Sequence, residues 1–281
     1  MNSKNDTLKN ILEKYDVKAK KKFGQNFLHD KNIINQIVKS SSCDKKYIVE
    51  VGPGPGLLTT AILEKNIKKI LVIETDKTFI PILKKFKENH SKKFDFIIND
   101  ILKVDLDKII NEKYSIVSNL PYNISVPFII SMIEREQPVK WEKLTLTVQK
   151  EVAERMMAKI NTKQYGRLSV LTQWRCKIHK ICDIKPTCFI PPPKVLSSVI
   201  SIEPRNNIIA PSVKNFQKIV SYAFGFRRKT LKKSLSNLDV DVNKLADLCG
   251  IDLRLRAQNL SIDDFSNLTF GYEKLSKQII S

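Results

Sequence analysis

The sequence YIVEVGPGPG at residues 47–56 decides the fold class of this chain. Its first five residues form an apolar run interrupted only by Glu50, which is typical of a buried strand in a parallel sheet. Three glycines follow at once, and residues 57–63 then have the pattern of a helix. A strand, a glycine turn and a helix form a nucleotide or nucleoside cradle, because glycine lets a ligand approach the backbone closely. The Gly-x-Gly-x-Gly spacing differs from the dinucleotide fingerprint, and no Lys-Ser or Lys-Thr pair follows to make a Walker loop.

Two acidic residues follow the next two apolar runs. Glu74 ends the run at 69–73, and Asp100 comes just after the run at 94–98. Ligands of open α/β sheets bind along the carboxyl edge of the strands, where both acids would lie. There Glu74 can accept from both ribose hydroxyls, and Asp100 can accept from an adenine amino group. The plainer interpretations are a surface acid for Glu74 and a helix N-cap for Asp100.

A fourth apolar run at 114–117 leads into Ser-Asn-Leu-Pro-Tyr at 118–122. Asn119 offers a carboxamide oxygen, and Leu120 precedes proline, so its carbonyl is turned away from helical geometry. Pro121 fixes the backbone, and Tyr122 offers an aromatic face. Two acceptors and a ring suit a planar ligand with an exocyclic NH2 group, as in adenine. The alternative is an ordinary strand-to-helix turn.

Taken together, the strand ends predict a site for S-adenosylmethionine. Its methionine part would lie over Gly52 and Gly54, its ribose on Glu74 and its adenine by Asp100. The methyl group would then point toward Asn119 and Tyr122. Acceptors on both hydrogens of an adenine NH2 favour a more pyramidal nitrogen, whose lone pair can attack that methyl group.

Composition narrows the class of partner and the compartment. The chain has 281 residues and a formal net charge of +20, an excess that favours a polyanion such as RNA. Five cysteines are an odd number without a disulfide framework, which fits a reducing cytoplasm. Cys176, His179, Cys182 and Cys188 match no common zinc spacing, so we expect no metal. We also expect no signal peptide and no membrane span.

The chain predicts an α/β, Rossmann-like S-adenosylmethionine-dependent methyltransferase sheet followed by a small helical C-terminal domain. Residues 1–204 would form the catalytic domain, including an N-terminal arm at 1–22, and residues 205–281 the helical RNA-binding domain. Further strands are expected at 143–148, 168–174 and 197–202, and a linker at 203–207. The arm ends in a basic cluster that either contacts phosphate or is solvated: Lys18, Lys20, Lys21 and Lys22.

Two loops and one basic run are further candidates for binding. Residues 23–30 are either a lid over a ligand or a plain loop. Phe189 precedes the proline run 191–193, a stiff segment that could present its ring opposite Tyr122, although core packing is as compatible with this spacing. In the helical domain, a cluster of cations suits RNA backbone contacts or a solvated helix surface: Arg227, Arg228, Lys229 and Lys232.

Several motifs occur in order along most of the chain: FGQNFL at 23–28, EVGPG at 50–54, Glu74, Asp100, NLPY at 119–122, QKEVAER at 149–155, YGRLSV at 165–170, FIPPP at 189–193 and FRRKTL at 226–231. In this set the chain resembles the ribosomal RNA adenine dimethyltransferases, most closely those that act on the small subunit. The glycine turn departs from the family by a doubled Gly-Pro, which leaves the role of Gly56 open.

The resemblance implies conversion of two adjacent adenosines in the 3′-terminal hairpin loop of 16S rRNA to N6,N6-dimethyladenosine. The donor would be S-adenosyl-L-methionine, and the substrate would be 16S rRNA within the assembling small ribosomal subunit. We expect a monomer. The candidate catalytic residues are Asn119, Leu120, Pro121, Tyr122 and Phe189. The cofactor-binding set is Asn26, Leu28, Gly52, Gly54, Glu74, Asp100 and Asn119.

Three other functions are alternatives on the same residues. A 23S rRNA adenine methyltransferase of the macrolide-resistance type shares the cofactor edge and the Asn-x-Pro-Tyr motif, but the FRRKTL run and the C-terminal length favour the small subunit. A non-catalytic ribosome assembly factor would not need the Asn119 motif and the acids. A nicotinamide dehydrogenase is disfavoured by the glycine spacing and because no catalytic His or Lys is evident.

Overall fold

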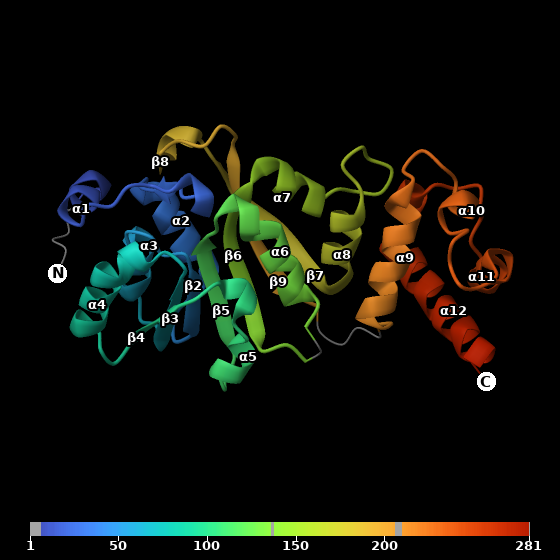
Figure 1. Ribbon diagram of the computed structural model, residues 1–281, viewed down its shortest axis with the longest axis horizontal. Coiled ribbons are helices and arrows are strands. Elements are labelled where there is room, and N and C mark those ends of the chain that lie inside the picture. Colours follow the sequence, from blue (N-terminus) through green and yellow to red (C-terminus); the bar gives the residue numbers. More distant parts are fainter. Residues whose placement is uncertain (1–6, 136–137, 206–209, 281) are drawn as a thin grey trace. The chain divides into compact units, whose positions relative to one another are not determined.

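The computed structural model describes residues 7–135, 138–205 and 210–280 (Figure 1). These residues group into two compact units. The first contains Met1–Ala153 and Ile178–Pro204, and the second contains Glu154–Lys177 and Arg205–Ser281. Residues 1–6 of the expected arm and residues 206 and 207 of the expected linker lie outside the described part. The second unit includes the segment 154–177, which the sequence assigned to the catalytic domain.

A mixed sheet forms the centre of the first unit. In the described residues its seven strands have the order β4-β3-β2-β5-β6-β9-β7. The first five strands in this order are parallel to one another, and β9 is antiparallel to β6. Most of these strands lie where apolar runs predict them. Their bounds are β2 Tyr47–Val51, β3 Lys69–Glu74, β4 Phe94–Ile98, β5 Tyr114–Asn119, β6 Trp141–Gln149, β7 Cys176–Ile184 and β9 Ser197–Pro204.

Helices pack on this sheet and bury its apolar side chains. Their bounds are α1 Leu8–Lys14, α2 Lys31–Ser41, α3 Leu57–Leu63, α4 Ile80–Asn89, α5 Leu106–Ile109 and α6 Tyr122–Ile133. Asp30 caps α2 as its position predicts, since its Oδ1 accepts from the amides of Asn32 and Ile33 at 2.9 and 3.0 Å. Ile37 of α2 and Ile62 of α3 are fully buried in the same core as the strand residues. This burial fixes the carboxyl ends of the strands in place.

A two-stranded pairing accompanies the sheet. β1 (Phe27–Leu28) and β8 (Phe189–Ile190) pair antiparallel, with Leu28 opposite Phe189. The segment after α1 is thereby joined to the proline-rich loop more than 150 residues later in the chain.

The predicted strand at 168–174 is wrong: these residues form helix α8 (Arg167–Arg175). Gly166 precedes the helix, and its amide donates to Ser169 Oγ at 3.1 Å. Val170 and Trp174 lie four residues apart on one buried face, and the Trp174 ring stacks on Phe216 at 3.8 Å. Packing on that aromatic ring therefore overrides the strand propensity of this apolar run.

The second unit is helical, as the sequence predicts. α7 (Lys150–Met156) leads into it, and the helices beyond the sheet are α9 Val213–Gly225, α10 Leu231–Ser234, α11 Val242–Cys249 and α12 Ile262–Ile280. Ser261 and Asp264 cap α12 reciprocally, with amide-to-side-chain distances of 2.8 and 3.1 Å. Phe216, Leu231 and Phe265 are fully buried in its separate core. Among the described residues, no helix is long and apolar enough to cross a membrane.

Candidate active site

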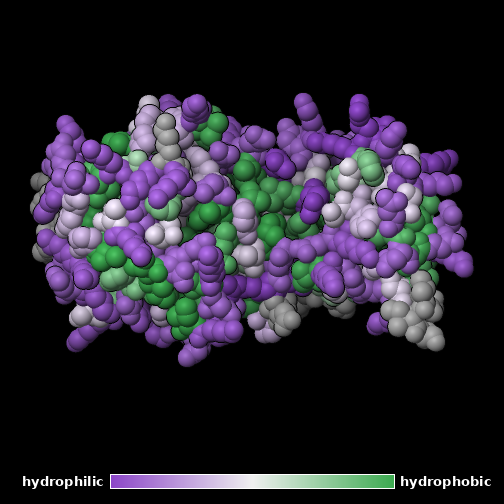
Figure 2. Space-filling view, viewed as in Figure 1, coloured by the Kyte–Doolittle hydropathy of each residue, from purple (hydrophilic) through white to green (hydrophobic). Residues whose placement is uncertain are grey.

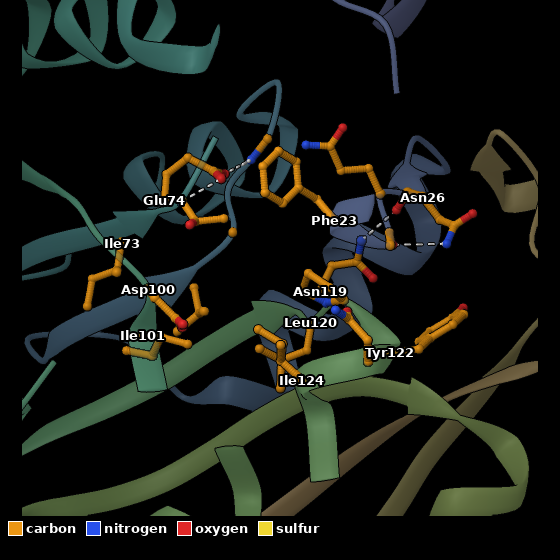
Figure 3. A pocket seen from close by; sticks show the side chains of 18 of the residues that line it. Phe23, Asn26, Ile73, Glu74, Asp100, Ile101, Asn119, Leu120, Tyr122 and Ile124 are labelled. Carbon is orange, nitrogen blue, oxygen red and sulfur yellow. Dashed lines mark hydrogen bonds between the residues drawn. The ribbon is translucent and has the colours of Figure 1, made fainter. Parts of the chain in front are cut away.

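A pocket of about 1010 Å³, part of it open to solvent, lies at the carboxyl ends of β2, β3, β4 and β5. Figure 3 shows Glu74 and Asp100 at one end and Asn119 with Tyr122 at the other. The expected site residues that line the pocket are Asn26, Gly52, Gly54, Glu74, Asp100, Asn119, Leu120, Pro121 and Tyr122.

Two glycines of the glycine turn, Gly52 and Gly54, line the pocket. Gly54 has φ +52°, and a Cβ there would lie 3.1 Å from ring carbons of Phe27, a pocket-lining residue. Gly56 has φ +86° and caps α3, and a Cβ at this position would lie 2.4 Å from the Phe86 ring. Gly52 and Gly54 therefore serve the pocket, whereas Gly56 serves the packing of α3 against α4.

Glu74 is held by the backbone around it. Its Oε1 accepts from the amides of Thr75 and Asp76, both at 2.8 Å, and its Oε2 accepts from Gly54 at 3.3 Å. Burial raises the pKa of Glu74, and these amide hydrogen bonds oppose the increase. Each carboxylate oxygen can accept more than one hydrogen bond, so a ligand hydroxyl can still bind here.

Asp100 caps a turn and also lines the pocket. It caps the short 3-10 turn Ile101–Lys103, where its Oδ1 accepts from the amide of Leu102 at 3.0 Å. It also lines the pocket beside Asn99 and Ile101. Capping uses one oxygen and leaves the other available to a ligand.

Asn119 ends β5 with its carboxamide oriented by a neighbour. Its Nδ2 donates to the backbone carbonyl of Asn26 at 3.0 Å, which leaves Oδ1 available as an acceptor (Figure 3). Pro121 follows in extended geometry, at φ −56° and ψ 133°, so the chain leaves the strand before α6 begins. Leu120 between them is buried and lines the pocket. The acceptor segment thus has a fixed backbone and a fixed amide.

Tyr122 is anchored through its hydroxyl. The Oη atom lies 2.5 Å from Ser197 Oγ at the start of β9. Burial raises the pKa of Tyr122, although the hydrogen bond to Ser197 lowers it somewhat, so the phenol is neutral near pH 7. Because Ser197 is fully buried, it gives the Tyr122 ring a rigid support.

Leu28 and Phe189 are not brought to the pocket. Leu28 is 5% exposed and Phe189 is 2% exposed, and both belong to the core of the first unit. They face each other across the β1–β8 pairing. In this conformation the Phe189 ring packs in the core, which is the alternative that the proline-rich sequence left open.

Sequence reasoning missed much of the pocket wall and one buried acid beside it. Strand-end positions could have indicated Ile73, Thr75 and Asn99. Asp76, which is 3% exposed, accepts from the side chains of Lys20 and Gln25, and no short-range pattern indicates these partners. Burial alone would raise the pKa of Asp76, but these donors and Thr78 lower it to about 2.

The expected RNA-binding residues belong to the second unit. Arg227, Arg228 and Lys229 follow α9, and Lys232 lies in α10; all four are exposed. The Arg227 guanidinium donates to the carbonyl of Lys163 within the same unit. Hydrophilic residues cover much of the face seen in Figure 2, in keeping with the high charged fraction of the chain.

The fold and the pocket at the carboxyl edge of its sheet define a Rossmann-like α/β methyltransferase. A family model described as ribosomal RNA adenine dimethylase matches residues 16–273. A relative from Pelagibacter ubique, named ribosomal RNA small subunit methyltransferase A, is 41% identical over 92% of this chain and 98% of its own length. A protein of the same name from Clostridium acetobutylicum is 38% identical over 92% of this chain and 95% of its own. The chain belongs to the ribosomal RNA adenine dimethylase family.

Solved structures agree with this fold. A dimethyladenosine transferase from Plasmodium falciparum aligns with a TM-score of 0.77 at 24% identity, covering 89% of this chain and 98% of that one. The 23S rRNA methyltransferase ErmE aligns with a TM-score of 0.66 at 21% identity, covering 88% and 100%. At these identities the likeness shows the architecture and does not decide between substrates.

Glu50, which is buried and lies just before the glycine turn, predicts that the free energy of unfolding depends on pH. Burial raises its pKa to about 8, opposed by the hydrogen bond from Thr59 Oγ1 at 2.7 Å and helped by the nearby charge of Glu74. The stabilisation from proton binding is complete below the ordinary pKa of 4.5 and is lost as pH rises through about 8. Between these values stability falls by up to about 1.4 kcal/mol per pH unit, since only the folded state keeps the proton.

We expect Glu50→Gln to remove this contribution to stability, so that the free energy of unfolding falls less steeply between pH 4.5 and about 8. Urea denaturation of both proteins at several pH values within the window measures it. Equal slopes for the wild type and the variant would show that Glu50 does not hold a proton in the folded state.

Proposed function

We propose that this protein uses S-adenosylmethionine to dimethylate the N6 amines of two adjacent adenosines in the 3′-terminal hairpin loop of 16S rRNA. One observation carries the proposal: Asn119 Oδ1 is left as an acceptor at the opposite end of the pocket from Glu74. Family membership and relatives named for the small subunit support the choice of substrate. The enzyme would act on the assembling small subunit.

The residues of the pocket fit S-adenosylmethionine. Glu74 and Asp100 both line the pocket and would accept from a ribose and an adenine, and a Cβ at Gly54 would press on the ring of Phe27, which also lines it. When bound, the cofactor supplies an electrophilic methyl group on a sulfonium sulfur. Asn26, Gly52, Gly54, Glu74, Asp100 and Asn119 would hold it.

The acceptor end of the pocket would hold a flipped adenine. The base leaves its stack at a cost of a few kcal/mol, which a loop position keeps low. Tyr122 provides a stacking face, and stacking contributes on the order of 1–3 kcal/mol per base. Asn119 Oδ1 and the Leu120 carbonyl accept from the amine and aim its lone pair at the methyl group. Stacking by Phe189 as well would require β8 to part from β1.

Catalysis in this arrangement is mainly positioning of an in-line displacement. The N6–C bond forms as the S–C bond breaks, and the amine proton then passes to water. Because the product of the first transfer still carries one N–H, one of these acceptors can orient it for the second.

Methyl transfer to small subunits lacking this modification tests the function. With radiolabelled S-adenosylmethionine, we expect label as N6,N6-dimethyladenosine in 16S rRNA, and none in large subunits. Asn119→Ala should abolish the label while circular dichroism and the unfolding midpoint stay unchanged, because Asn119 is only partly buried. Label confined to 23S rRNA would indicate the resistance-type activity. Tight subunit binding without any label would indicate an assembly factor.

Glu74→Gln tests the cofactor end separately. The substitution keeps the shape but removes the charge, so S-adenosylhomocysteine should bind about tenfold more weakly, as expected for one charged hydrogen bond. Isothermal titration calorimetry measures the affinity, with Glu112→Gln at an exposed ion pair as the matched control. Unchanged affinity in Glu74→Gln would remove this carboxylate from the ligand site.

We further propose that the second unit contacts RNA through Arg227, Arg228, Lys229 and Lys232. Phe226, which is 52% exposed, lies next to these cations and adds a ring on which a base can stack. Arg228 and Lys229 are the sharper test, since Arg227 already has a carbonyl partner.

We expect Arg228→Ala/Lys229→Ala to weaken small-subunit binding and to reduce the slope of log K against log salt by about 0.7–0.9 for each phosphate that the variant no longer neutralises. Lys244→Ala/Lys274→Ala removes the same charge from other positions of this unit and should leave the slope nearly unchanged. Filter binding across a salt series measures both slopes. An equal reduction in the two variants would mean that only overall charge matters.

A further inference from the structure

A hydrogen-bonded cluster next to the pocket ties the N-terminal segment to the end of β3. Lys20 Nζ donates to Asp76 Oδ1 at 2.8 Å, and Gln25 Nε2 donates to Asp76 Oδ2 at 2.9 Å. Gln25 Oε1 also accepts from the backbone amide of Lys20 at 2.7 Å. Both oxygens of a carboxylate that is only 3% exposed are thus occupied by one short stretch of chain.

That stretch forms one wall of the pocket. Residues 23–27 all line it, and they include Gln25, one of the two residues that contact Asp76. The far end of the stretch is held by Phe27, whose ring meets Phe79 edge-on at 5.9 Å. In between, Gly24 lies so close to the chain that follows Asn119 that a Cβ would sit 2.9 Å from Asn123 Oδ1 and 3.6 Å from Pro121 Cβ. The segment is therefore fixed at both ends and seated against the residue after Tyr122.

The same cluster connects the two ends of the pocket. The amide of Asp76 donates to Glu74 Oε1 at 2.8 Å, at the expected ribose position. At the other end, the carbonyl of Asn26 accepts from Asn119 Nδ2 at 3.0 Å. The route from Glu74 to Asn119 runs through Asp76, Gln25 and the backbone of Asn26.

We propose that Lys20, Gln25 and Asp76 form a clamp that positions residues 23–27 along the cofactor and, through the Asn26 carbonyl, orients the Asn119 carboxamide. The inference rests on the proposed function, because it assumes a cofactor at Glu74 and an amine at Asn119. The three residues of the clamp are positioning residues, since each acts through the segment they hold.

This role separates Lys20 from its basic neighbours. The sequence groups Lys20 with Lys18 and Lys22 as a cluster for phosphate contact. The ammonium groups of Lys20 and Lys22 both lie over the Phe23 ring, at 5.9 and 4.8 Å from its centroid, but the Lys20 ammonium also donates to Asp76 Oδ1. Lys20, a cation of the N-terminal arm, thus forms an ion pair within the protein.

Lys20→Met tests the clamp, because it removes the ammonium from a side chain that is 36% exposed and keeps most of its apolar stem. We expect the Kd for S-adenosylhomocysteine to rise, and kcat at saturating cofactor to fall, by about tenfold or more. Amide hydrogen exchange across residues 23–27 should speed up, while the unfolding midpoint stays near that of the wild type. Lys20→Arg should restore affinity, exchange and kcat.

A matched control and a double variant sharpen the test. Lys68→Met breaks an exposed ion pair with Glu112 of 2.7 Å and should change none of these readouts. Asp76→Asn should reproduce Lys20→Met, and the double variant should be little worse than either single one, because the two act on one contact.

Binding and exchange need no RNA, so they test the clamp even if the substrate of the enzyme proves to be different. Wild-type affinity and wild-type exchange across 23–27 in Lys20→Met would overturn it. The clamp would also be overturned if Lys20→Met lowered only the unfolding midpoint and kept the wild-type kcat and Kd. An inactive wild type that still shows the Lys20→Met effect on Kd and exchange would count against the proposed function and support the clamp.

Discussion

The parallel pairing of β2 with both β3 and β5 is the constraint on which this site depends. Val51 lies in register with Ile73, and Val49 with Ile116, so the glycine turn opens where the strand order reverses. Ligands of open α/β sheets bind at such a switch point. Glu74 and Asp100 then fall on one side of the turn and Asn119 on the other. The topology thus places the two carboxylates and the carboxamide on opposite sides of the glycine turn, where, under the proposed function, a methyl donor and its acceptor would meet.

Three buried carboxylates near this edge show why the N-terminal segment belongs to the site. An ionised carboxylate loses its hydration on burial and needs a proton, hydrogen bonds or a cation in return. Glu50 keeps a proton, with its pKa raised by burial to about 8. Glu74 is held by the amides of Gly54, Thr75 and Asp76. Asp76 instead accepts from the side chains of Lys20 and Gln25. These hydrogen bonds replace its lost hydration and hold a distant part of the chain beside the pocket.

The sequence predicts the sheet and most of the site because both follow from local runs. Apolar stretches mark β2 to β6, and parallel pairing sends every strand end to the same edge, so Glu74, Asp100 and Asn119 could be placed together. The strand predicted at 168–174 is wrong because a short apolar run fits a strand as well as a buried helix. The stacking of Trp174 on the Phe216 ring decides for the helix. The burial of Phe189 depends on its pairing partner Leu28. The contact of Lys20 with Asp76 joins residues 56 positions apart, and no periodicity reports such a pair.

Under the proposed function, the acceptor end must align two different amines. Adenosine offers two N–H groups, which Asn119 Oδ1 and the Leu120 carbonyl can both accept. Monomethyladenosine offers only one, and its methyl group must occupy the direction that the other acceptor served before. Hydrogen bonding therefore restrains the second substrate less than the first, and stacking must carry more of the alignment. The hydroxyl of Tyr122, held 2.5 Å from the buried Ser197, fixes that ring independently of the amine. A rigid stacking face beside two fixed acceptors, of which the second amine needs only one, suits two successive transfers at one nitrogen.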